Sequence, residues 1–164
     1  MHDSFIASII LLSPQIALIT AMIVLLLLKI CSTVNLRIMS HFSIAFLLLS
    51  LYLNISNYIK IGDAYAFNGV IFNDNFIYLA NNFIIITSIL IFFLLSSVKN
   101  LPQEVAILLL GSIVGSMIMI ASNDFIALYL GLELASLSLY IAVASRTDDD
   151  FSLESGIKYF ILSS

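Results

Sequence analysis

The chain has 164 residues, of which 62% are hydrophobic and 10% are charged, and its mean hydropathy is +1.15. Soluble domains carry about 25% charged residues, so this composition excludes an ordinary soluble domain and predicts an all-α integral membrane protein in a lipid bilayer. With a formal net charge of −4 and one cysteine, Cys31, the sequence also argues against a nucleic-acid face, an internal disulfide and a cysteine metal site.

Apolar runs long enough to span a bilayer recur along the chain. We expect five complete transmembrane helices and the start of a sixth, at residues 6–28, 42–58, 76–98, 105–122, 125–144 and from Ser152 onward. The sixth run stops before the roughly 20 residues that a span requires. The chain therefore reads as the N-terminal part of a larger helical bundle.

The connectors carry turn and capping signals. In the extramembrane connector near residues 60–75, Asn68-Gly69 stands between apolar residues, which is a signal for a short β-hairpin; an ordinary polar loop is an equal alternative. The turn 122–124 is too short for anything but antiparallel neighbouring helices. Asp124 and Ser152 are the expected N-caps of the fifth and sixth helices.

Basic residues predict the orientation of the chain in the membrane. The first, third and fifth loops carry Lys29, Arg37, Lys99 and Arg146, whereas the opposite side has Lys60. Because cytoplasmic or matrix-side loops are enriched in Lys and Arg, we expect the N-terminus on the outer side.

Glu133 is a carboxylate inside the apolar run 125–144. At 1.5 Å per residue it lies about 12 Å from one end and about 16 Å from the other, near the bilayer centre. A charge there costs about 2.5–3.5 kcal/mol on insertion scales, and such residues usually mark an ion or proton path. The alternative is a carboxyl kept neutral by burial and used only for packing.

Two faces of the fifth helix differ in character. A polar stripe on the Glu133 side offers possible proton or water contacts, namely Tyr129, Ser136 and Tyr140. The other side carries small residues that permit close helix packing, namely Gly131, Ala135, Ser138 and Ala142. Gly111 and Gly115 form a GxxxG spacing in the fourth helix, which we interpret as a packing feature.

Lys158 lies four residues after Glu154 in the sixth helix, the spacing of a same-face ion pair. One interpretation is a lysine that extends to the membrane edge beside a stabilising partner. The other is a proton-relay lysine whose proton affinity responds to nearby carboxylates. Spacing alone leaves both open.

Two segments carry a specific resemblance. Residues 121–140 (ASNDFIALYLGLELASLSLY) and 153–162 (LESGIKYFIL) resemble subunit 2 of respiratory complex I, called subunit N in bacteria. Pro14-Gln15 and the segment 67–69 are similar to the first hairpin region of that family. The match centres on residues 101–164. Before residue 101, the chain agrees with the family in the number and orientation of its helices rather than in individual residues.

The resemblance implies a proton-translocating subunit of the complex I membrane arm, related to cation/proton antiporters and coupled to NADH:ubiquinone electron transfer. Residues 1–100 would form an N-terminal three-helix region, and residues 101–164 would begin an antiporter-like repeat. The family glutamate that matches Glu133 pairs with a lysine on a later broken helix, which this chain lacks. Lys158 and Glu154 match a further family lysine and glutamate expected on the proton path.

The resemblance also implies the surroundings of the chain. It requires no cofactor here, because FMN, iron–sulfur clusters and ubiquinone would reside elsewhere in the complex. The expected partners are other membrane-arm subunits and a second polypeptide that completes subunit 2 after a gene split. Composition and gene splitting favour the mitochondrial inner membrane, with the N-terminus facing the intermembrane space. Alternatives are a fragment of a multisubunit cation/proton antiporter and a purely structural membrane-arm anchor.

Overall fold

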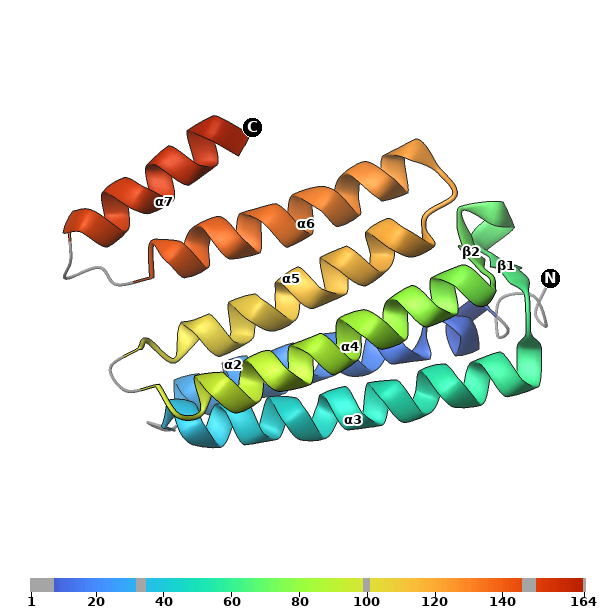
Figure 1. Ribbon diagram of the computed structural model, residues 1–164, viewed down its shortest axis with the longest axis horizontal. Helices are drawn as coiled ribbons and strands as arrows, with labels where there is room; N and C mark the ends of the chain where they lie inside the picture. The colour runs from blue at the N-terminus through green and yellow to red at the C-terminus, as the bar shows by residue number, and fades with distance from the viewer. Residues whose placement is uncertain (1–7, 32–34, 99–100, 146–149, 164) are drawn as a thin grey trace.

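Figure 1 shows the computed structural model, which describes residues 8–31, 35–98, 101–145 and 150–163. The helices are α2 (Ser13–Cys31), α3 (Leu36–Ile61), α4 (Asn75–Leu95), α5 (Glu104–Ala121), α6 (Phe125–Val143) and α7 (Asp150–Ser163). Between α3 and α4 lie β1 (Ala64–Ala66), the 3₁₀ turn η1 (Phe67–Gly69) and β2 (Ile71–Asn73). In the described part of the chain, α2 to α6 are long and apolar enough to cross a membrane, which confirms the predicted fold class.

The starts of the first two helices differ most from the prediction. The second helix begins at Leu36 rather than near residue 42, because Met39 and Ser40 are fully buried and tertiary packing extends the helix beyond its apolar run. The first helix begins at Ser13, after a separate helical turn at residues 8–11. Pro14 fits at this start because the N–H groups in the first turn of a helix have no carbonyl partner within the helix, so proline loses no hydrogen bond there. Residues 6 and 7 of the predicted helix lie outside the described residues.

The hydrophobic core is built by α2, α3, α4 and α5. Its fully buried members include Leu18 of α2, Leu47 of α3, Phe92 of α4 and Leu110 of α5. By contrast, α6 lies at the edge of the bundle: 17% of its span is buried, against 44% for α5. The first helices therefore form a scaffold, and α6 is attached to its surface.

Helix α6 is attached to α5 by a very close backbone contact. A Cβ at Gly115 would lie 2.5 Å from the backbone nitrogen of Ala135 and 2.7 Å from the carbonyl oxygen of Gly131. A Cβ at Gly131 would lie 2.7 Å from the backbone nitrogen of Met119. The predicted packing role is confirmed for Gly115, Gly131 and Ala135, since side chains cannot be accommodated where two backbones touch.

The predicted hairpin is present, so the loop alternative was wrong. β1 pairs antiparallel with β2, with Tyr65 opposite Phe72 and their rings stacked at 4.5 Å between centroids. The turn needs positive φ at Asn68 (57°) and Gly69 (90°), which Asn and Gly tolerate better than other residues.

Each end of the bundle is tied across sequence-distant elements. At the hairpin end, the Asn123 backbone N–H donates to the Val70 carbonyl at 2.8 Å, and its side-chain amide donates to the Gly69 carbonyl at 2.9 Å. At the opposite end (Figure 1), Lys29 and Glu104 form an ion pair. The pair joins the C-terminus of α2 to the N-terminus of α5. A positive charge is favourable at the C-terminus of a helix and a negative charge at the N-terminus, so the helix dipoles stabilise both side chains.

The α5–α6 contact predicts the effect of a bulky residue. Gly115→Leu should lower the free energy of unfolding by about 3 kcal/mol. The leucine side chain would push the two helix backbones apart, and overpacking of this kind lies at the upper end of the cost of inserting a larger side chain into a packed core. The measurement is unfolding of the full chain by SDS titration in mixed micelles. Ala45→Leu, on an exposed position of α3, is the control and should leave the midpoint unchanged; equal effects at both sites would contradict the close contact.

Candidate functional site

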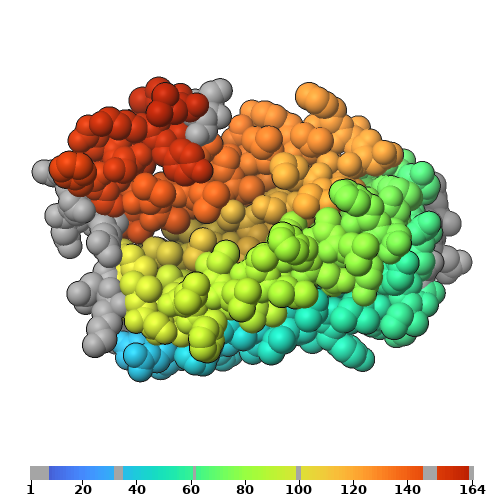
Figure 2. Space-filling model, viewed as in Figure 1, coloured from blue at the N-terminus to red at the C-terminus, as the bar shows by residue number. Residues whose placement is uncertain are grey.

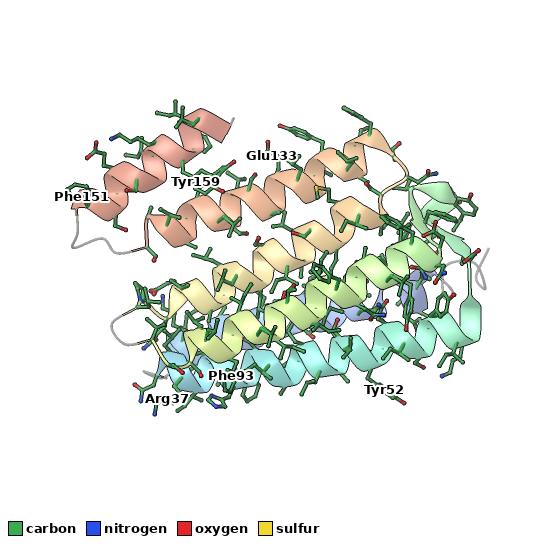
Figure 3. The ribbon with its side chains drawn as sticks, viewed as in Figure 1. Arg37, Tyr52, Phe93, Glu133, Phe151 and Tyr159 are labelled. Atoms are coloured by element: carbon green, nitrogen blue, oxygen red, sulfur yellow. The ribbon has the colours of Figure 1, made fainter. Side chains whose placement is uncertain are left out.

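Glu133 lies midway along α6 on the side that faces away from α5 (Figure 3). The start of α6 is fixed by Asp124, whose Oδ1 accepts hydrogen bonds from the backbone N–H groups of Ile126 at 2.8 Å and Ala127 at 3.4 Å. The predicted cap is therefore confirmed. Since Gly131 and Ser138 lie against α5, helix geometry turns Glu133 outward.

The nearest polar neighbours of Glu133 are one helical turn away. The hydroxyl group of Tyr129 interacts with the Glu133 carboxylate, and Tyr129 is itself exposed. The Ser136 hydroxyl instead donates to the backbone carbonyl of Glu133 at 3.2 Å. In this conformation, Tyr129 contacts the carboxylate and Ser136 supports the helix backbone.

Tyr140 is on the same stripe but lies beneath α7. It is only 8% exposed, and its ring packs edge-on against Tyr159 at 4.8 Å and Phe160 at 5.7 Å between centroids. Figure 3 shows Tyr159 on the side of α7 that faces α6. The stripe therefore consists of an open part around Glu133 and a covered aromatic part.

Lys158 and Glu154 form the predicted ion pair on α7, with 2.5 Å between Nζ and Oε1. Their side chains remain 68% and 60% exposed. The predicted cap at Ser152 was wrong, because α7 begins at Asp150. The Ser152 hydroxyl instead donates to the Val143 carbonyl at 2.6 Å. It thus provides a hydrogen-bond donor for one of the last carbonyl groups of α6, which have no partner within the helix.

The structure thus brings four of the predicted site residues together as two pairs, one on each helix. Figure 2 shows that α7 covers only the C-terminal part of α6 and leaves the rest of this side open. An apolar groove of about 330 Å³ runs between the two helices and is lined by Leu137, Tyr140, Ile141, Ala144, Gly156, Ile157 and Phe160. Within the described residues, no group of three or more His, Cys, Asp or Glu side chains could hold a metal.

Sequence reasoning missed a cluster of buried amides beneath the hairpin. The Asn54 amide donates to Asn82 Oδ1 at 3.0 Å, and the Asn57 amide donates to the Ile10 carbonyl at 2.7 Å and to Ser13 Oγ at 3.0 Å. The available signal was the recurrence of Asn within otherwise apolar spans, since polar groups at membrane depth require partners.

Comparison with known proteins gives one consistent family. Residues 122–164 match a transmembrane family described as NADH:quinone oxidoreductase/Mrp antiporter. NADH-quinone oxidoreductase subunit N of Paramagnetospirillum magneticum is 39% identical over 108 residues, which are 60% of this chain and 21% of that protein.

Two other relatives carry the same name. Subunit N of Jannaschia sp. is 36% identical over 121 residues, 71% of this chain and 24% of that protein. Subunit N of Pelagibacter ubique is 52% identical over 60 residues, 37% of this chain and 13% of that protein. The chain spans less than a quarter of the length of these relatives. The predicted resemblance is confirmed: this chain is similar to subunit N of NADH-quinone oxidoreductase, and its residues 122–164 match the NADH:quinone oxidoreductase/Mrp antiporter transmembrane family.

Proposed function

We propose that this chain forms the N-terminal part of a proton-translocating membrane-arm subunit of complex I, in which Glu133 is the protonatable gate. The observation that carries the proposal is the position of Glu133. It lies in the segment that matches the family, midway along α6 and on the face that the bundle leaves open. Electron transfer from NADH to ubiquinone would drive the pumping, with FMN, iron–sulfur clusters and quinone bound elsewhere in the complex.

The physical basis is the cost of an isolated carboxylate in a membrane. Glu133 must either be protonated or have a cation nearby, because an uncompensated buried charge is strongly unfavourable. Tyr129 provides a hydroxyl group for the carboxylate but no positive charge. We therefore place the compensating lysine on a second polypeptide that packs against the open face of α6. Moving that charge would change the proton affinity of Glu133.

We assign Lys158 and Glu154 to the same proton path as Glu133. Their ion pair, with 2.5 Å between Nζ and Oε1, puts an amine and a carboxylate together on the helix that packs beside α6. Tyr129 and Ser136 would carry protons or water near Glu133, and Tyr140 would act where α7 meets α6.

The surroundings follow from the same proposal. The other membrane-arm subunits and the completing polypeptide would be the partners, in the mitochondrial inner membrane. Amino-acid composition supports that membrane, although the relatives named above are bacterial. The bias of Lys and Arg supports an N-terminus on the intermembrane-space side. The division into a three-helix region at 1–100 and a repeat starting at 101 stays a prediction.

A second candidate is a multisubunit cation/proton antiporter, because the description of the matching family includes Mrp antiporters. It differs from the first in having no need of NADH. Sodium-dependent transport by an assembly that contains this chain and does not oxidise NADH would favour it.

The central test is Glu133→Gln in the assembled complex. The variant keeps the shape and hydrogen-bonding capacity of the side chain but removes its titratable proton. We expect NADH-driven proton translocation in proteoliposomes to fall at least about tenfold, the scale of losing a group that must accept and release the transported proton.

Glu104→Gln is the matched control, because it also removes one carboxylate but at the helix end paired with Lys29. A partly exposed pair at a helix end contributes about 1 kcal/mol, so pumping should persist. Full pumping by Glu133→Gln would overturn the gate role and leave the chain as a structural anchor.

Lys158→Arg separates the relay interpretation from the structural one. Arginine can keep the ion pair with Glu154 and reach the membrane edge, but it stays protonated at all relevant pH values. We therefore expect normal assembly, measured by native gel, with loss of most NADH-driven proton translocation. Pumping at the wild-type rate would show that Lys158 serves only as a positive charge.

A further inference from the structure

A small, partly open cavity lies beneath the hairpin, between α2 and α4. Its volume is about 10 Å³, measured as the space open to the centre of a water molecule. The hairpin lines it through Ile71, Phe72 and Asn73, and the helices contribute Gln15, Asn54 and Asn81. A space of about 10–15 Å³ on this measure holds one water molecule.

Two hydrogen-bond acceptors in the cavity wall have no protein partner. They are Oε1 of Gln15 and Oδ1 of Asn81, on side chains whose residues are 5% and 2% exposed. The third helical amide of the wall, Asn54, has its N–H group engaged with Asn82 Oδ1. Buried acceptors almost always have a partner, so two unpaired oxygens in one cavity require an explanation.

We propose that this cavity is a binding site for a single structural water molecule that donates one hydrogen bond to Gln15 Oε1 and the other to Asn81 Oδ1. Water has two donor hydrogens, which matches two neutral acceptors. A metal ion fits less well, because no carboxylate lines the cavity and hard cations take six or more oxygen ligands. The uncharged walls give no compensation for a bound cation.

The water molecule would connect two helices that otherwise pack mainly against α3 and α5. It would also lie directly under β2, and the hairpin holds the α5–α6 turn through Asn123. The site thus belongs to the scaffold that positions α6, and it is independent of the chemistry proposed at Glu133.

The direct test is a cryo-EM map of the intact membrane assembly that contains the full chain, at a resolution where ordered waters are visible. We expect one density peak about 2.5–3.0 Å from both oxygens. The proposal is wrong if the two amides pair with protein donors and no peak is present. It is also wrong if the peak has six or more oxygen ligands at about 2.3–2.6 Å, as a metal ion would.

A double-mutant cycle gives an independent readout. Gln15→Leu and Asn81→Leu should each raise the unfolding equilibrium constant of the full chain about tenfold, because each leaves the water and the other acceptor poorly paired. The double variant should also show about a tenfold effect, since the second substitution removes an acceptor that the first has already left poorly paired. The control combines Asn81→Leu with Asn57→Leu, because Asn57 lies outside the cavity wall. The effects of these two substitutions on the unfolding equilibrium constant should multiply to about a hundredfold. A multiplicative effect for Gln15 and Asn81 would contradict a shared water molecule.

Discussion

The close backbone contact between α5 and α6 is the constraint on which the rest of the structure depends. Gly115 and Gly131 leave no space for a Cβ on either side, so α6 can lie against α5 in one rotational setting only. That setting buries the small-residue face and turns the opposite face outward. The position of Glu133 is thus a consequence of where the glycines lie, rather than of any contact that the carboxylate itself makes.

The other elements hold this contact in place from its two ends. At one end the hairpin binds the α5–α6 turn through the backbone and side chain of Asn123. At the other end the ion pair between Lys29 and Glu104 joins the start of α5 to the end of α2. Between them, α5 supplies much of the buried core. The first helices therefore act as a rigid support for α6, whose outer face stays available.

Local signals in the sequence predicted most of the fold. Hydropathy located the helices because a bilayer requires long apolar runs, Asn68-Gly69 predicted the hairpin, and Asp124 predicted the start of α6. Sequence could not predict that Ser152 would serve the end of α6, since that depends on how α7 approaches it. The burial of Tyr140 under Tyr159 depends on the same approach. The shared cavity of Gln15 and Asn81 was likewise beyond reach, because it arises only when residues far apart in the chain pack together.

In the proposed function, the open face of α6 is one half of a site that further helices of the membrane assembly complete. The most direct measurement is a structure of the intact membrane assembly, with the chains around α6 identified from density and mass spectrometry. We expect further helices to cover the Glu133 face and to place a lysine amine within about 4 Å of the carboxylate, or one water molecule away from it. A Glu133 face covered by lipid, with no cationic side chain near the carboxylate, would contradict it.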